Sequence, residues 1–147
     1  MLPNLITAVQ RGQFRWIGGG RHLTSTCHVK NVCEGALLAA DRGRPGEIYF
    51  LTDGPPVEFR DFVARMLRAV GVEPTDGTVP LGVARALAAV TETVWRLLRL
   101  RGTPPVTRMA VGLVGAEVTV SDAKARRELG YAAKVSIEDG LAGMAAG

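Results

Sequence analysis

The sequence predicts an α/β fold in which a small, partly parallel sheet is surrounded by helices. Short β-type runs alternate with segments whose apolar residues recur at helical spacing, which is typical of α/β proteins. About four short strands are expected among roughly six or seven helices, so helices dominate. The chain has 147 residues, 47% of them hydrophobic and 22% charged, enough to bury a core. We therefore expect one domain over residues 1–147.

The first elements are a helix and two strands. Apolar residues at helical spacing predict a helix over Leu2–Arg11. Phe14–Ile17 alternates like a strand, and the three glycines Gly18–Gly20 after it predict a hairpin turn. Leu23–Val29 can extend as the second strand, so this part of the chain is expected to begin the sheet.

A capped helix and a buried strand are expected next. Asn31, followed by Glu34, has the spacing of a capping box and predicts a helix that ends at Gly43. Glu47–Leu51 is apolar and predicts a buried strand. The order strand, helix, strand favours parallel pairing.

The second half is mostly helical. Pro55 and Pro56 fit the start of an amphipathic helix that ends at Gly71. The remaining expected elements are a short strand at Thr78–Val79, a long helix at Leu81–Leu100, a shorter helix over Val106–Val114, a helix over Asp122–Leu129 capped by Ser121, and a last helix opened by Ser136 with Asp139.

The net charge of +4 has a local origin. The segment 80–110 contains five arginines and one acidic residue, Glu92, which accounts for the whole excess. We expect its long helix to be a lid or packing helix, although Trp95 beside Arg96 also fits a helix that binds a membrane surface. Arginines without interleaved aromatic residues do not indicate nucleic-acid binding. No apolar run is long enough to span a bilayer.

Two cysteines, Cys27 and Cys33, do not form a disulfide framework, and the sequence shows no signal-peptide pattern. We therefore expect a reduced, cytoplasmic protein. Together with His22 and His28 they could be drawn as four zinc ligands. Adjacent residues of a strand point to opposite faces, however, so we expect no metal site.

Four stretches, in this order, carry a family resemblance: Phe14–Gly20 (FRWIGGG), His28–Val32 (HVKNV), Gly46–Pro56 (GEIYFLTDGPP) and Ser121–Tyr131 (SDAKARRELGY). They resemble the C-terminal, substrate-binding part of the extended short-chain dehydrogenases, the NAD-dependent epimerase/dehydratase superfamily. The most similar branch is the 3β-hydroxysteroid dehydrogenase-like one. The resemblance implies a Rossmann-type parent and an oxidoreductase activity.

The resemblance also implies a cofactor half that this sequence lacks. Members of the family hold NAD or NADP on a glycine-rich strand–turn–helix and transfer a proton through a Tyr-x-x-x-Lys pair. Here Tyr131 and Lys134 are three residues apart, and no helix is expected to open after Gly18–Gly20. We therefore expect no catalytic and no cofactor-binding residue in this chain, no bound cofactor and no activity of the chain alone. Its expected partner is the missing N-terminal Rossmann half.

The expected substrate is apolar. Nucleotide-sugar members carry an Arg shortly before the His-Val motif, where this sequence has Thr24, and Arg21 is offset. This favours a secondary alcohol or ketone on an apolar, steroid-like substrate. Trp16, Thr24, Thr26 and His28 are the expected substrate-binding residues. For two of them a structural role is the alternative: Trp16 as a packing residue and His28 as a residue that fixes the strand–helix junction.

Two alternatives to this function stay open. The chain could be a non-catalytic, dehydrogenase-like binding or regulatory module, or part of a nucleotide-sugar epimerase or dehydratase. Apolar surface left uncovered by a missing half would also favour a homo-oligomer.

Overall fold

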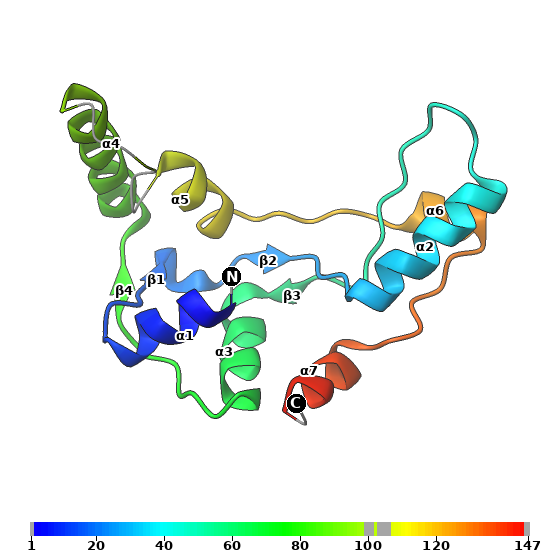
Figure 1. Ribbon diagram of the computed structural model, residues 1–147, viewed down its shortest axis with the longest axis horizontal. Coiled ribbons are helices and arrows are strands. Elements are labelled where there is room, and N and C mark those ends of the chain that lie inside the picture. Colours follow the sequence, from blue (N-terminus) through cyan, green and yellow to red (C-terminus); the bar gives the residue numbers. More distant parts are fainter. Residues whose placement is uncertain (1, 99–101, 103–106, 146–147) are drawn as a thin grey trace.

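The computed structural model describes residues 2–98, 102 and 107–145. Figure 1 shows helices around short strands. In chain order the elements are α1 (Leu2–Gln10), β1 (Trp16–Ile17), the 3-10 helix η1 (Gly18–Gly20), β2 (Leu23–Thr24), α2 (Val29–Arg42), β3 (Val57–Glu58), α3 (Phe59–Ala69), β4 (Thr78–Val79), α4 (Leu81–Leu97), α5 (Arg108–Val114), α6 (Ala123–Leu129) and α7 (Ile137–Ala145).

The strands form two small sheets of two strands each. β1 pairs in parallel with β4, and β2 pairs antiparallel with β3. Thr24 of β2 also forms a parallel bridge with Val118. The mixed α/β fold and the partly parallel pairing were predicted correctly.

The predicted hairpin at Gly18–Gly20 is wrong, because the strands on its two sides belong to different sheets. The three glycines instead form η1, with φ angles of 60°, 81° and 70°. Only glycine adopts such angles without strain. A Cβ added at Gly20 would also lie 3.1 Å from the ring of Trp16.

Buried residues form three small clusters instead of one core. The first lies among α1, β1 and α3 and contains Val9, Trp16, Val63 and Leu67. The second joins α4 to α5 through Ala84, Ala88 and Val111. The third contains Ala125, Leu129 and Tyr131, packed against α2 and the segment 47–51.

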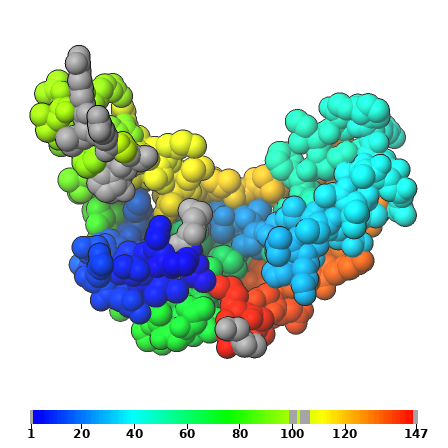
Figure 2. Space-filling view, viewed as in Figure 1, coloured from blue at the N-terminus to red at the C-terminus, as the bar shows by residue number. Residues whose placement is uncertain are grey.

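Two arms extend from the centre of the molecule. α4 and α5 lie at one end of the long axis, α2 and α6 at the other, and α1, α3 and α7 lie below them (Figure 1). The space-filling view shows a hollow between the arms (Figure 2). Within the described part of the chain, no helix has the length and apolar character needed to cross a bilayer.

The segment Glu47–Leu51 was predicted as a buried strand, and this prediction is wrong. It is not part of either sheet, and Ile48 and Phe50 are 72% and 54% exposed. The alternate residues Tyr49 and Leu51 pack against the third cluster. Such alternation is what a strand shows. The prediction fails because no described segment of the chain lies beside it to form a ladder.

The predicted cap of α2 is also wrong. The helix begins at Val29, and His28 is its N-cap, with Nδ1 accepting a hydrogen bond from Lys30 N at 3.2 Å. Asn31 lies in the first turn instead. α3 begins at Phe59, later than Pro55 and Pro56 suggested, because Val57 and Glu58 pair with β2.

Several local predictions are confirmed. α2 ends with Gly43 as its C-cap, and β4 is Thr78–Val79. The helix expected over Asp122–Leu129 is present as α6, but its N-cap is Asp122 and not the predicted Ser121, whose hydroxyl accepts a hydrogen bond from Ala123 N at 3.3 Å. At the start of α7 the Ser136 hydroxyl donates to Asp139 Oδ2 at 2.7 Å, and Asp139 N donates to Ser136 Oγ at 3.1 Å. The predicted end of the long helix at 99–100 and the start of the next helix at 106 lie outside the described residues.

Candidate functional site

Three of the four expected substrate-binding residues lie on one stretch between β2 and α2. Thr24 is half-buried in β2, and the carbonyl of Thr26 accepts a hydrogen bond from Asp53 N at 2.9 Å. The backbone N–H of His28 donates to the Asp53 carboxylate at 2.6 Å. The loop that carries Asp53 therefore holds this stretch in place.

Trp16 lies elsewhere, in the first cluster. It is 1% exposed, its Nε1 donates to the Thr75 carbonyl at 2.6 Å, and its ring packs edge-on against Phe14 at 4.8 Å. The arrangement is that of a packing residue with its polar atom satisfied.

Asn31 and Asp53 connect three segments of the chain beside His28. Asn31 Nδ2 donates to Asp53 Oδ1 at 2.7 Å and to the Val135 carbonyl at 2.8 Å. Its Oδ1 accepts from Lys134 N at 3.0 Å and from Val135 N at 3.1 Å. Both polar atoms of this buried amide are thus used, which fixes the start of α2 against the 52–56 loop and the segment 134–135.

A second network lies next to the first. Thr52 Oγ1 donates to Asp122 Oδ2 at 2.9 Å, and Tyr131 donates to the Thr52 carbonyl, also at 2.9 Å. Arg126 forms an ion pair with Asp122 at 2.8 Å, and its hydrogen bond is the main reason that the pKa of Asp122 lies below the ordinary aspartate value. Burial raises the pKa of Tyr131 well above its usual value, so this phenol is a poor proton donor or acceptor for catalysis.

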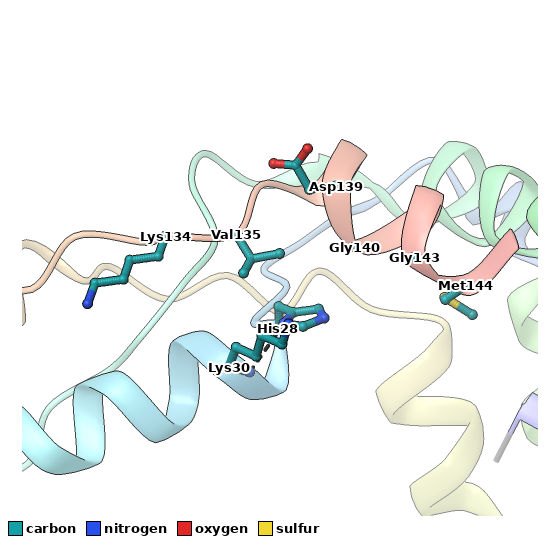
Figure 3. A pocket seen from close by; sticks show the side chains of 8 residues that line it. All are labelled: His28, Lys30, Lys134, Val135, Asp139, Gly140, Gly143 and Met144. Carbon is teal, nitrogen blue, oxygen red and sulfur yellow. Dashed lines mark hydrogen bonds between the residues drawn. The ribbon is translucent and has the colours of Figure 1, made fainter. Parts of the chain in front are cut away.

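His28 faces a cavity of about 550 Å³ between α2 and α7 (Figure 3). Because Nδ1 accepts the cap hydrogen bond, the proton of the neutral ring is on Nε2. The ring packs against Gly140, where an added Cβ would lie 3.1 Å from Cδ2. The cavity is lined by His28, Lys30, Lys134, Val135, Asp139, Gly140, Gly143 and Met144.

The side chains that line this cavity can contact a small molecule, but they include no acid–base pair suited to proton transfer. Lys134 Nζ is paired with Glu34 at 2.7 Å, and the Asp139 carboxylate is held by Ser136. A second cavity, of about 530 Å³, lies between the 52–56 loop and the segment 119–122, and Arg126 also lines it.

The four residues considered as zinc ligands lie in different environments. His22 stacks on Phe59 at 5.1 Å, Cys27 is half-buried, and Cys33 is exposed on α2. Burial raises the pKa of the Cys27 thiol. In residues 2–98, 102 and 107–145 no group of three or more histidine, cysteine or acidic side chains is placed to hold a metal ion.

Asn31, Asp53 and Tyr131 organise this region, and the sequence alone did not single them out as site residues. Asn31 was interpreted as a helix cap, and Asp53 and Tyr131 were part of longer stretches with a family resemblance. Their partners are 22 to 104 positions away for Asn31 and 79 positions away for Tyr131. Local patterns carry no signal for contacts of this range.

Large apolar side chains are exposed on the α2 arm, both on α2 itself and on the segment 47–51. We call this set the α2 surface, and it consists of Val29, Val32, Leu37, Ile48 and Phe50. It includes the unpaired segment 47–51. Exposed apolar side chains beside an unpaired, extended segment are typical of an interface.

No protein-family profile matches the chain. The chain is 54% identical over 140 residues to the 4-hydroxy-2-methyl-3-oxo-4-farnesyl-3,4-dihydroquinoline-1-oxide ketoreductase of Stigmatella aurantiaca, which covers 95% of this chain and 42% of that protein. It is 34% identical to a 2-alkyl-3-oxoalkanoate reductase of Stenotrophomonas maltophilia, over 96% of this chain and 44% of the relative. A sterol-4-alpha-carboxylate 3-dehydrogenase (decarboxylating) of Dictyostelium discoideum is 32% identical, with the same two coverages. The chain thus spans less than half the length of these relatives.

Solved structures show the same fold. The crystal structure of gox2253 superposes with a TM-score of 0.62 at 27% identity and covers 96% of this chain and 42% of that one. A dTDP-glucose 4,6-dehydratase from Streptomyces venezuelae, with NAD bound, gives a TM-score of 0.62 at 23% identity, over 99% of this chain and 37% of that one. The second likeness shows the fold alone.

Proposed function

We propose that the chain is the C-terminal part of an extended short-chain dehydrogenase of the 3β-hydroxysteroid dehydrogenase-like branch and forms the substrate-binding side of an NAD(P)-dependent oxidoreductase. The substrate would be a secondary alcohol or ketone carried by an apolar molecule. The observation that carries the proposal is the 54% identity to a ketoreductase of a farnesylated quinoline. The names of the second and third relatives give a 2-alkyl-3-oxoalkanoate and a sterol-4-alpha-carboxylate, each of which joins a large apolar part to a carboxylate.

In this proposal the α2 surface receives the cofactor-binding half. The segment 47–51 has the alternation of a strand, with Tyr49 and Leu51 inward and Ile48 and Phe50 exposed. A strand from another part of the enzyme would satisfy its backbone groups, and the exposed side chains beside it would be buried. Residues 1–147 would then be one substrate-side domain.

In the proposed enzyme, the cofactor-binding half and this substrate-binding half would have different roles in the reaction. The cofactor would supply hydride transfer, and a Tyr-x-x-x-Lys pair in the other half would move the proton. This chain would bind and orient the substrate through Thr24, Thr26 and the Nε2–H of His28. Trp16 would contribute by fixing β1, because its ring is 1% exposed and already fully packed.

A chimera tests the proposal. This chain replaces the matching segment of the Stigmatella ketoreductase, and NAD(P)H oxidation is measured with that enzyme's ketone. We expect turnover, because the two segments are 54% identical. A folded chimera that binds NAD(P)H but reduces neither this ketone nor other apolar ketones would contradict the proposal.

The role of His28 needs a variant that keeps the helix cap. His28→Asn supplies a side-chain oxygen for the cap but removes the Nε2–H. In the chimera we expect KM for the ketone to rise several-fold while thermal stability stays unchanged. An unchanged KM would leave His28 as a cap alone.

A further inference from the structure

The cavity between α2 and α7 contains a hydrogen-bond donor for which the described residues offer no acceptor. His28 Nδ1 is used by the helix cap, so the proton of the neutral ring lies on Nε2. The half-buried ring lines the cavity, and no described residue accepts a hydrogen bond from this Nε2–H. A donor partly shielded from water favours a ligand that brings an oxygen acceptor.

The charges around the cavity favour a neutral ligand. Lys134 is paired with Glu34 at 2.7 Å. The two remaining charged residues of the lining, Lys30 and Asp139, have opposite signs, so the lining carries no net charge. Figure 3 shows the charged ends of Lys134 and Asp139 pointing away from the His28 ring. The oxygen held here is therefore expected to be that of an alcohol or a ketone.

α7 presents small residues and one methionine to this cavity. Gly140, Gly143 and Met144 are three and four residues apart, which places them on one face of the helix, and all three line the cavity. α7 is held from another side, where Leu141 is buried and Glu138 forms an ion pair with α3 at 3.0 Å. The packing of α7 on α3 therefore leaves the cavity face uncovered.

The open space lies beside Gly143. A Cβ added at Gly140 would lie 3.1 Å from His28 Cδ2, so the helix and the ring are in contact there. At Gly143, one turn further along, an added Cβ would meet nothing within 4 Å. Val135 and Met144 supply apolar walls. A cavity of about 550 Å³ with apolar walls and one available donor has the character of a small-molecule site.

We propose that this cavity binds an aliphatic alcohol or ketone, whose oxygen accepts a hydrogen bond from His28 Nε2–H and whose alkyl chain lies beside Gly143 and Met144. That this ligand is part of the substrate of an oxidoreductase rests on the proposed function. Gly143 would then set the size of the alkyl chain that is accepted, because a larger side chain at this position would occupy the same space.

The two histidines of the chain give a direct test. Only His28 lines the cavity, whereas His22 stacks on Phe59. The chain, labelled with nitrogen-15 at histidine, is titrated with 1-octanol at about pH 8, above the ordinary histidine pKa of about 6.5, and the ring nitrogens are followed by NMR. We expect the His28 signals to shift and saturate while the His22 signals stay unchanged.

Two variants change the cavity in opposite ways. Gly143→Leu should weaken 1-octanol binding at least about tenfold, because its side chain fills the space. Met144→Ala removes an apolar wall without filling anything and should weaken binding about threefold or more. The matched control is Gly82→Leu at an exposed position of α4, where an added Cβ also meets nothing within 4 Å, and it should bind normally. Circular dichroism checks that all variants are folded.

The proposal is overturned if 1-octanol leaves the His28 signals unchanged, shifts both histidines alike, or binds Gly143→Leu as tightly as the original chain. If Gly143→Leu does not fold, equal binding by Met144→Ala overturns it. Turnover by the chimera tests the proposed function separately. Octanol binding by a chain whose chimera is inactive would contradict only the proposed function, whereas turnover without this binding would contradict only the present inference.

Discussion

At the scale of single residues, the molecule depends on one buried amide. Asn31 is 1% exposed, and its side chain makes four hydrogen bonds to the Asp53 carboxylate and to the backbone of Lys134 and Val135. Because the Asn31 amide donates a hydrogen bond to the Asp53 carboxylate, an acidic side chain at position 31 could not make the same contact. The sequence pattern pointed to the right residue but assigned it to the helix cap.

We expect Asn31→Asp to destabilise the fold by about 2–4 kcal/mol, since two carboxylates would face each other and two donors would be lost. Urea denaturation followed by circular dichroism measures the change. The matched control is Asn4→Asp, the same substitution at an exposed position in the first turn of α1, where a negative charge is favourable. Equal effects of the two substitutions would contradict the assigned network.

The lowered pKa of Asp122 predicts how the stability of the fold changes at acidic pH. Its pKa is lowered chiefly by the hydrogen bond from Arg126 and also by that from Thr52, against the opposing effect of burial. A carboxylate with a lowered folded-state pKa stabilises the protein fully above the ordinary aspartate value of about 3.9. This stability is lost as the pH falls below that value through the folded-state pKa. The variant Asp122→Asn should therefore lose less stability between about pH 5 and pH 2 than the original chain. Equal losses, measured as urea midpoints over this range, would contradict the prediction.

At the scale of elements, the sequence predicted what local chemistry decides. The start of α7 was predicted because Ser136 and Asp139 cap each other within four residues, and Gly43 marked the end of α2. The strands were predicted too long, and the hairpin at Gly18–Gly20 was wrong, because pairing depends on distant segments such as β4 and β3. For Glu47–Leu51 the alternation was present, but no described segment pairs with it.

The contact between α2 and that segment is testable at Gly35. A Cβ added there would overlap the Leu51 side chain, with Cδ2 only 2.7 Å away. We expect Gly35→Ala to cost about 1–3 kcal/mol despite the better helix propensity of alanine. Gly143→Ala in α7, where a Cβ meets nothing within 4 Å, should instead gain about 0.5–1 kcal/mol. Thermal melts of both variants decide, and a stabilising Gly35→Ala would contradict the described packing.

At the scale of the whole molecule, the shape is compatible with the proposed substrate-side domain. Two arms enclose a hollow (Figure 2), and the α2 surface is apolar and exposed. The resemblance in sequence predicted the fold class correctly. It could not predict which side chains would be exposed, because exposure depends on how distant elements meet.

The chain by itself should not bind its cofactor. We expect no saturable binding of NAD or NADP by calorimetry, because the sequence contains no glycine-rich strand–turn–helix of the dinucleotide-binding type. Light scattering of the same samples should show self-association that Leu37→Glu reduces, since that leucine belongs to the α2 surface. Micromolar affinity for NAD would place the cofactor site within this chain and contradict the proposed division of work.

The three separate clusters also predict which part of the protein unfolds first. Units that share few buried contacts can unfold one at a time while the others stay intact. The fully buried residues that join α4 to α5 are only two alanines and one valine, with Ile17, Val79 and Leu81 packed against them. In hydrogen–deuterium exchange the amide protons of α4 and α5 should exchange sooner than those of α3, where Val63 and Leu67 anchor the helix against Trp16. The arm formed by α4 and α5 is therefore expected to rearrange at the lowest free-energy cost.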